Sequence, residues 1–369
     1  MKILYFGRYE LPDKDATANR VVANAKIMRA LGHDVILAGW SKKIEKKNCY
    51  KKSQYFGFEC YEKYQERTSF DKFKTFTDAK NELFLLKTQK ADLVIAYNFP
   101  AIALKKIIKY CKKHTIKCIA DVTEWFTNFN PNPFFRAVKA YDSYLRMKVL
   151  HKKTDGLIVI SKYLENYYAK QKTVLIPPLV DKSESKWLSS QKISRKIFRL
   201  VYAGWPNKAK ERLDLLVNSI EKIAERLPLQ LDIYGINEQD YRRIYSLQDG
   251  NVFPPCIIFH GKVSHQEALQ AVKNADYSLI IRESSRKNNA GFPSKLVESI
   301  SCGTPVLTTA ISNVVDYVHD GNNGYIISIA TLEQDIEKAI QYRNHVKVND
   351  GLFDCSRYIP SMAAFLNSL

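Results

Sequence analysis

The sequence has no uncharged apolar run of roughly 18 residues, the length that a membrane-spanning helix needs. The apolar stretch at residues 2–7 is too short for a signal peptide, so we expect a cytoplasmic chain. The 7 cysteines, an odd number at scattered positions, favour reduced thiols over a disulfide framework. No two of them have zinc-site spacing, since Cys111 and Cys118 are too far apart for a knuckle.

The signs of a bound cofactor are missing too. No G-x-G-x-x-G opens the first predicted helix, and no acidic residue ends the second predicted strand to hold a ribose. Asp13 and Asp15 form an Asp-x-Asp pair of the kind that can bind a metal-bound nucleotide, but beside Pro12 they indicate a solvated turn. We therefore predict no cofactor and no metal ion.

Positive charge is in excess, and it is concentrated in one half of the chain. Residues 1–190 hold 36 Lys and Arg against 19 Asp and Glu, a net +17, and residues 191–369 hold 21 against 19, a net +2. Within residues 41–90 lysines are interleaved with aromatics, which suits either single-stranded nucleic acid or a bilayer surface. No nucleic-acid motif accompanies them, so an anionic membrane is the favoured partner and nucleic acid is not expected. Scattered surface lysines without a target are the alternative.

Apolar strands alternate with helices along the chain. Residues 2–7 predict a strand, residues 17–31 a helix and residues 34–38 a second strand, a βαβ unit that implies a parallel sheet. The alternation resumes after a polar stretch rich in lysine and serine. The length suits two α/β domains, each a doubly wound Rossmann-like sheet. The predicted parts are a first domain at 1–183, a linker at 184–196, a second domain at 197–348 and a tail at 349–369 that could form a helix crossing back to the first domain.

The strongest functional signal lies at residues 291–307. They predict a short helix that begins at Pro293, and the N–H groups near Ser294 and Lys295, with the helix dipole, form an anion site. Glu298, one turn further on, could accept hydrogen bonds from sugar hydroxyls. This arrangement suits a nucleotide diphosphate-sugar. On this stretch alone, a capped core helix with a solvated lysine and glutamate is an equal alternative.

Arg282, residues 289–298 and residues 302–306 together resemble the donor-site signature of retaining glycosyltransferases of family 4, which have the GT-B fold. The resemblance extends over most of the second half of the chain and implies two Rossmann-like domains facing a cleft. One feature departs from the family. Of its two glutamates separated by seven residues, the second is Glu298 and the first falls on Ala290.

The resemblance also implies which residues bind the donor: Gly7, Lys208, Lys210, Arg282, Gly291, Phe292, Pro293, Ser294, Lys295 and Glu298. Lys208 or Lys210 would neutralise the diphosphate, because Trp205 stands near the position of the arginine that relatives use. Four residues are candidates for catalysis: Asp121, Glu124, Asn289 and Glu298. Asp121 and Glu124 follow a predicted strand where relatives carry a histidine, and they could equally cap the loop and the next helix. Asn289 could orient sugar hydroxyls in place of the missing carboxylate.

The predicted function is that of a retaining glycosyltransferase. It would move a sugar from a nucleotide diphosphate-sugar, with UDP the expected nucleotide, to an acceptor sugar. We expect a lipid-linked acceptor in surface-polysaccharide synthesis, with the protein peripheral on the inner face of the cell membrane. Two alternatives stay open. One is a GT-B-type sugar-nucleotide epimerase, for which His260 and Asp121 are the only hints, and the other is an inactive nucleotide-sugar-binding protein, which Ala290 favours.

Overall fold

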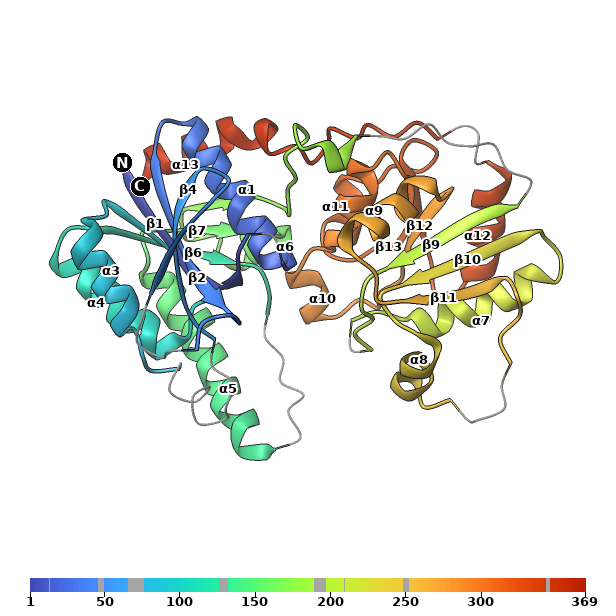
Figure 1. Ribbon diagram of the computed structural model, residues 1–369, viewed down its shortest axis with the longest axis horizontal. Coiled ribbons are helices and arrows are strands. Elements are labelled where there is room, and N and C mark those ends of the chain that lie inside the picture. The colour runs from blue at the N-terminus through green and yellow to red at the C-terminus, as the bar shows by residue number, and fades with distance from the viewer. Residues whose placement is uncertain are drawn as a thin grey trace. The chain divides into compact units, whose positions relative to one another are not determined.

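A computed structural model of the chain describes residues 1–12, 14–45, 50–65, 76–125, 132–188, 197–208, 210–247, 252–342 and 346–369. They form two compact units (Figure 1). Unit 1 is Met1–Leu179 with Cys355–Leu369, and unit 2 is Val180–Asp354. Each unit has its own largely parallel sheet with helices packed on it, so the predicted α/β fold class is confirmed. Most of the predicted linker lies outside the described residues, and the predicted domain boundaries stay a prediction.

Unit 1 is built on an eight-stranded sheet in the order β3-β4-β2-β1-β5-β6-β7-β8, parallel except for the β3–β4 pair. Its strands are β1 (Lys2–Glu10), β2 (Asp34–Ser41), β3 (Lys51–Tyr55), β4 (Phe58–Tyr64), β5 (Leu93–Tyr97), β6 (Lys117–Val122), β7 (Gly156–Val159) and β8 (Thr173–Leu175). Its helices are α1 (Ala16–Ala30), α3 (Lys80–Gln89), α4 (Ala101–Lys113), α5 (Pro133–Leu145), α6 (Lys162–Tyr167) and α13 (Ile359–Ser368), with short helical turns at Arg146–Leu150, His151–Lys153 and Cys355–Tyr358.

The strands of unit 1 are buried on both faces, as expected for a parallel sheet between helices. Along β1, Leu4 and Phe6 join the core under α3 and α4, and the intervening Ile3 and Tyr5 point to the other face. There α1 packs against α13. The tail helix is held closely, because a Cβ placed on Gly156 of β7 would lie 2.8 Å from the Phe365 ring.

Much of residues 41–90, the stretch in which lysines are interleaved with aromatics, belongs to the fold of unit 1. The β3–β4 hairpin extends the sheet beside β2, and α3 packs on α4. Of the aromatics, Phe58 is buried, and Tyr50 packs edge-on against Tyr61 at 5.9 Å. Phe70 and Phe73 lie outside the described residues. In the β3–β4 hairpin the aromatics divide: Phe58 is buried in the sheet, whereas Phe56 at the turn is exposed.

Unit 2 has a six-stranded, all-parallel sheet in the order β11-β10-β9-β12-β13-β14. Its strands are β9 (Phe198–Ala203), β10 (Leu229–Tyr234), β11 (Ile257–Gly261), β12 (Tyr277–Ile280), β13 (Val306–Thr309) and β14 (Gly324–Ile327). Its helices are α7 (Leu213–Ala224), α8 (Glu238–Tyr245), α9 (His265–Asn274), α10 (Arg286–Ala290), α11 (Ser294–Ser301) and α12 (Leu332–Gln341), with 3-10 turns at Ser185–Trp187 and Val314–Asp316. Helices α7 and α12 contact each other, and α9 and α11 form a second pair.

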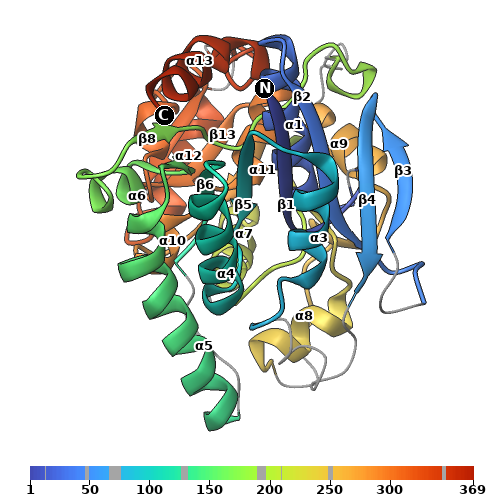
Figure 2. The same ribbon diagram turned by 90° about the vertical axis from the view of Figure 1, so that its left-hand side faces the viewer.

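No helix of the described residues is both long and apolar enough to cross a bilayer. One helix nevertheless stands out from its unit. Figures 1 and 2 both show α5 extending beyond the end of the unit 1 sheet, and along its length only Ser143 is buried.

Candidate functional site

The candidate site lies where the strand order of the unit 2 sheet reverses. From β9 the chain runs through β10 and β11 toward one edge, and from β12 it runs through β13 and β14 toward the other. Open parallel sheets bind ligands outside the carboxyl ends of their strands at such a point. Here β9 leads into Gly204 and β12 leads through Ile281 into Arg282, and α11 contacts β12 and β13.

The front end of α11 has the geometry of an anion site. The helix begins at Ser294, and Pro293 is its N-cap with an extended ψ of 110°. The prediction that Pro293 is the first helical residue is therefore wrong by one position. The first amides of a helix lack intrahelical acceptors, and the dipole makes this end positive. One turn on, the Glu298 Oε1 lies 3.4 Å from the Nε2 of His265 at the start of α9.

Two of the predicted cations meet on a buried carboxylate that sequence analysis did not single out. Glu211, in the loop before α7, accepts from Arg282 Nη2 at 2.6 Å through one oxygen and from Lys295 Nζ at 2.5 Å through the other. The Tyr202 hydroxyl also donates to Glu211 and accepts from Lys295 Nζ at 2.9 Å. We call Glu211, Arg282, Lys295 and Tyr202 the ion cluster. The signal in the sequence was slight: one acidic residue among the lysines that follow the first strand of unit 2.

The charged groups of the ion cluster shift one another's pKa values. Burial raises the pKa of Glu211, but the charges of Lys295 and Arg282 outweigh it and bring this pKa down to about 2. Burial lowers the pKa of Lys295, and Glu211 opposes that effect. Burial and the Glu211 charge both raise the pKa of Tyr202, so its hydroxyl keeps its proton. One carboxylate between two cations leaves an excess of one positive charge.

Glycine at the end of β9 lets Lys295 reach this position. Gly204 has a φ of 128°, and a Cβ built on it would lie 2.6 Å from the Cε of Lys295. A Cβ on Gly235, after β10, would lie 2.6 Å from the carbonyl carbon of Gly204. The lysine stem therefore passes closely over the end of β9, and a side chain at position 204 would displace it.

The structure does not bring the predicted Lys208 and Lys210 side chains into the ion cluster. Lys208 is exposed, and its Nζ lies 5.8 Å from the centroid of the Tyr245 ring. Lys210 contributes its backbone carbonyl, which accepts from Asn288 Nδ2 at 3.2 Å. Near them, Trp205 is 48% exposed, and Lys262 Nζ lies 5.5 Å from its ring.

The residues around the missing carboxylate hold a loop together. Ala290 is completely buried. Asn289 uses both ends of its amide: its Oδ1 accepts from the Ser312 N–H at 2.9 Å, and its Nδ2 donates to Ser284 Oγ at 3.1 Å. These bonds link α10 to the segment that follows β13. In this structure the Asn289 amide therefore makes one hydrogen bond within the protein at each end.

Gly291 and Phe292 join α10 to α11. Gly291 is extended, with φ −92° and ψ −177°, so its backbone makes no demand for glycine. Phe292 is buried and packs edge-on against Tyr317 at 5.4 Å and against Phe353 at 6.1 Å. These contacts give Phe292 a packing role at the start of α11.

Two of the predicted residues of unit 1 are internal to its fold. Asp121 is fully buried, where the Nη2 of Arg20 lies 2.8 Å from its Oδ1 and the Tyr5 hydroxyl also donates to it. A residue enclosed in this way cannot touch acceptor or donor, so the prediction of direct contact by Asp121 is corrected to a structural ion pair. A Cβ on Gly7 would lie 2.7 Å from the Cβ of Tyr97, so this glycine allows β1 and β5 to approach. Glu124 is different, because it lines a pocket in unit 1.

Comparison with known proteins finds a family match within unit 2. Residues 197–342 match the family described as "Glycosyl transferases group 1". An uncharacterized glycosyltransferase of Methanocaldococcus jannaschii is 26% identical over 218 residues, which cover 54% of this chain and 53% of that protein. The chain thus spans about half the length of this curated relative.

Solved structures share the fold of the whole chain. The sucrose-phosphate synthase of Thermosynechococcus elongatus has a TM-score of 0.70 at 13% identity, over 100% of this chain and 98% of that one. Anabaena HepE, solved with UDP and glucose, has a TM-score of 0.67 at 14% identity, over 100% of both chains. Residues 197–342 thus match a glycosyltransferase family model, and the chain as a whole has the GT-B fold.

Proposed function

We propose that the protein transfers a sugar, with retention at the anomeric carbon, from a nucleotide diphosphate-sugar to an acceptor saccharide. The observation that carries this proposal is the ion cluster. Arg282 and Lys295 lie side by side, both partly buried, at the ends of β9 and β12, in the unit that contains the match to the group 1 family. Two cations held in a shielded position by one carboxylate suit an anionic ligand better than they serve the stability of the unit.

Each part of the site has a task in this proposal. The diphosphate binds near the first amides of α11, with Ser294, Lys295 and Arg282 supplying charge and hydrogen bonds. These groups stabilise the charge that develops on the leaving diphosphate as the glycosidic bond breaks. Glu298 holds the ribose hydroxyls. Glu211 orients the two cations before the donor arrives, and exposed Lys208 adds long-range attraction.

UDP is the nucleotide that we propose first, because Anabaena HepE, which shares the fold, was solved with UDP and with UDP-glucose. We test the donor with a thermal-shift panel of UDP-, GDP- and ADP-sugars. A ligand at a hundred times its Kd adds roughly 2.7 kcal/mol to stability, which is easily detected. UDP-sugars should raise the melting temperature, and Lys295→Ala should remove that rise. If no nucleotide sugar shifts the wild type, the proposed donor site is wrong.

Incubation of the wild type with the stabilising donor then gives the reaction class. Free sugar or a glycosylated acceptor indicates a transferase. Binding without turnover would instead indicate the nucleotide-sugar-binding alternative. A new sugar-nucleotide would indicate an epimerase, but His260 bonds to Asp232 at 2.8 Å in unit 2, and Asp121 is buried in unit 1. The structure therefore offers no reason to favour an epimerase.

We further propose that the acceptor is lipid-linked, in surface-polysaccharide synthesis, and that unit 1 docks on anionic lipid. Helix α5 supports the docking of unit 1 on a lipid surface. Three of its aromatic side chains are largely exposed: Phe134, Tyr141 and Tyr144. Phe134 and Tyr141, seven residues apart, share one face of the helix, and Arg136 and Lys139 lie in the same helix. Exposed aromatics beside basic residues suit the headgroup region of a bilayer.

A further inference from the structure

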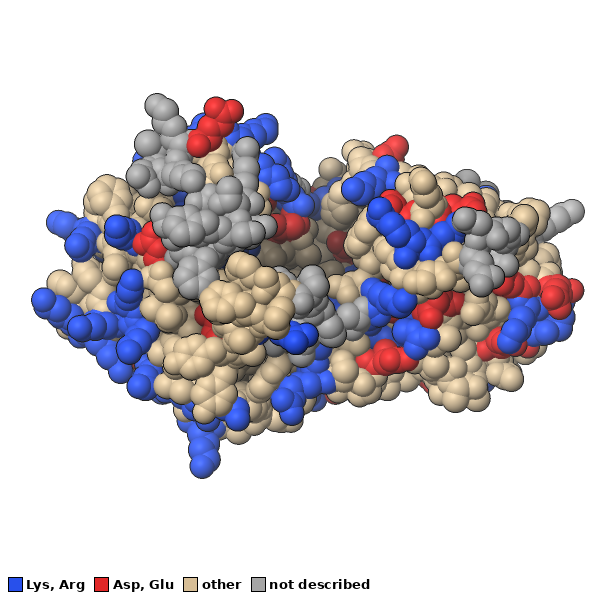
Figure 3. Space-filling model, turned by 90° about the horizontal axis from the view of Figure 1, so that it is seen from below, with Lys and Arg blue, Asp and Glu red and all other residues tan. Residues whose placement is uncertain are grey.

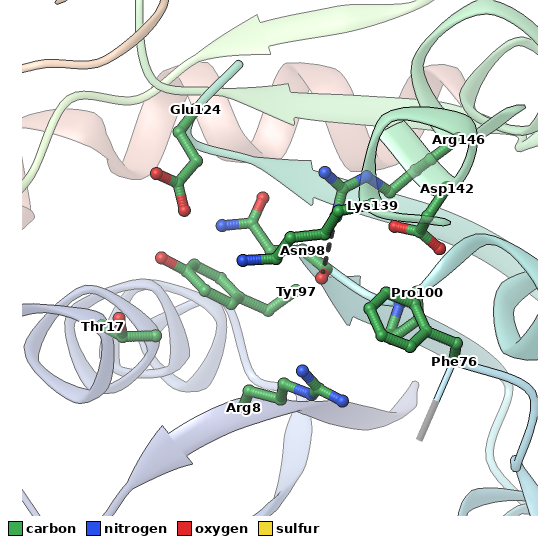
Figure 4. A pocket seen from close by; sticks show the side chains of 10 residues that line it. All are labelled: Arg8, Thr17, Phe76, Tyr97, Asn98, Pro100, Glu124, Lys139, Asp142 and Arg146. Carbon is green, nitrogen blue, oxygen red and sulfur yellow. Dashed lines mark hydrogen bonds between the residues drawn. The ribbon is translucent and has the colours of Figure 1, made fainter. Parts of the chain in front are cut away.

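Unit 1 has its own reversal of strand order, and a pocket lies there. From β1 the chain runs to β2 on one side, and β5 and β6 lie on the other. A pocket of about 200 Å³ opens at the carboxyl ends of β1, β5 and β6 (Figure 4). It is lined by Arg8, Thr17, Phe76, Tyr97, Asn98, Pro100, Glu124, Lys139, Asp142 and Arg146. Such a position is the usual ligand site of an open α/β sheet.

Part of the lining is a rigid frame. Asn98, directly after β5, has a φ of 41°, and its amide bonds twice to Thr123, donating to Oγ1 at 2.6 Å and accepting from the N–H at 3.3 Å. The backbone carbonyl of Asn98 accepts a hydrogen bond from Arg146 Nη1 at 3.2 Å, and Arg146 is only 3% exposed. Asp142 accepts from the Ala101 N–H at the start of α4, at 2.7 Å. These bonds fix the shape of the pocket wall.

Other lining groups direct charge into the pocket. In Figure 4 the Arg8 and Lys139 side chains approach the pocket from β1 and α5, and Glu124 approaches from the loop after β6. The lining holds three cations, Arg8, Lys139 and Arg146, against the two carboxylates of Glu124 and Asp142. The pocket is therefore positive by one charge, and cations and a carboxylate converge in it with the hydroxyl of Thr17. Groups of both kinds are needed to bind a charged saccharide.

We propose that this pocket binds an anionic group carried by the acceptor saccharide, a phosphate or a carboxylate next to one sugar ring. Arg8 and Lys139 bind the anion, and Glu124 accepts a hydrogen bond from a hydroxyl of the ring. The volume is below the roughly 300–1,000 Å³ of pockets that enclose drug-sized ligands, so it suits a single charged sugar unit. The assignment of this ligand as acceptor rests on the proposed transferase function.

The test measures binding of small probes to the full chain by calorimetry. The probes are glucose 1-phosphate, glucuronate and neutral methyl glucoside. The wild type should bind at least one of the two anionic probes about tenfold more tightly than the neutral one, and the preferred anion tells phosphate from carboxylate. Arg8→Gln and Lys139→Gln should each weaken that binding about tenfold or more, as expected for a lost charge-assisted hydrogen bond. Equal binding of the neutral sugar, or unchanged binding in both variants, would overturn the proposal.

Two controls separate this proposal from the transferase itself. Arg136→Gln changes an exposed cation of α5 that does not line the pocket, so it should leave probe binding unchanged. UDP binding should be the same in all variants, because the proposed donor groups belong to unit 2. If the anionic probes bind but no nucleotide does, the pocket is confirmed as an anion site and the transferase proposal is wrong. If both pocket variants bind UDP normally and transfer sugar as fast as the wild type, the pocket does not bind the acceptor, and the transferase proposal is unaffected.

Discussion

Glu211 is the residue on which the proposed donor site depends most, although it would not touch the donor. A buried carboxylate between Arg282 and Lys295 keeps two like charges together where they would otherwise repel. Removing one partner from such a cluster leaves uncompensated buried charge, which costs on the order of 3–5 kcal/mol.

Glu211→Gln should therefore lower the melting temperature strongly. Saturating UDP should raise it by more in the variant than in the wild type, because the diphosphate supplies the missing negative charge. Glu238→Gln is the matched control, since Glu238 is half exposed and pairs with Arg242 on the surface of α8. That pair should contribute less than about 1 kcal/mol. A Glu211→Gln protein as stable as the wild type would contradict this account of the ion cluster.

The pH dependence of the unfolding free energy is a second test of the role of Glu211. The folded pKa of about 2 lies below the ordinary value of 4.5, so the ionised carboxylate stabilises the fold above pH 4.5. This contribution falls as pH drops from about 4.5 through about 2. Denaturant unfolding should show the gap in stability between wild type and Glu211→Gln narrowing across that window. A gap that stays constant there would show that the charge of Glu211 is not what stabilises the cluster.

Ala290 offers a second test at single-residue scale. By the resemblance in sequence, it stands where the family signature has its first glutamate, yet it is completely buried. A glutamate here would force a charge into a filled space, at a cost of several kcal/mol. We expect Ala290→Glu to lower the melting temperature without raising turnover. Ala290→Ser, which adds one oxygen, should be milder in both respects. If Ala290→Glu created activity in an inactive parent, the wild type would be a binding protein.

At the scale of elements, α11 and α5 present opposite designs. Helix α11 buries most of its residues and leaves its first turn to the proposed ligand, whereas α5 buries only Ser143. An amphipathic helix whose aromatic side chains stay exposed suits an external apolar surface. On α5 the aromatics Phe134 and Tyr141 lie on one helical face, beside basic residues.

We expect Phe134→Ser with Tyr141→Ser to weaken co-sedimentation with acidic liposomes at least tenfold, since burying such a side chain contributes about 1.5–3 kcal/mol. Phe84→Ser on α3 is the control, because Phe84 is 60% exposed and lies outside α5. It should leave liposome binding unchanged. Equal losses in both proteins would show that exposed aromatics act unspecifically and that α5 is not the docking element.

At the scale of the whole molecule, the charge of the chain is almost all in its first half. Residues 1–190 carry +17 of the net +19. Figure 3 shows Lys and Arg predominating on the left of the face drawn, the side that unit 1 occupies. Each lysine or arginine near an anionic leaflet contributes about 1 kcal/mol at low salt.

Liposome binding should therefore need acidic lipid and should fall as salt is raised from about 0.05 to 0.5 M, as the Debye length shortens. Neutral liposomes should sediment little protein. Equal binding to neutral and acidic vesicles would contradict an electrostatic role for unit 1. Tighter binding to single-stranded nucleic acid than to acidic vesicles would indicate that nucleic acid is the partner.

The amino-acid sequence was sufficient for the fold class because its signals are local. Buried strands in a parallel sheet appear as short apolar runs, and the helices between them appear as apolar periodicity, so residues 17–31 and 34–38 are confirmed as α1 and β2. The pattern at residues 289–298 likewise predicts the front of α11 within one residue. Its resemblance to a family signature was recognisable because backbone geometry at a helix start restricts which residues fit.

Only the tertiary structure decided which charges meet. Lys295 and Glu211 are 84 positions apart, and Arg20 and Asp121 are 101 apart. No local pattern encodes such a pair, because it forms only when strand order brings distant loops to the same end of a sheet. For the same reason Asp121 and Glu124 have different environments, although they are only three residues apart. The first is buried under α1 by Arg20, and the second lines an open pocket with Arg8 and Lys139.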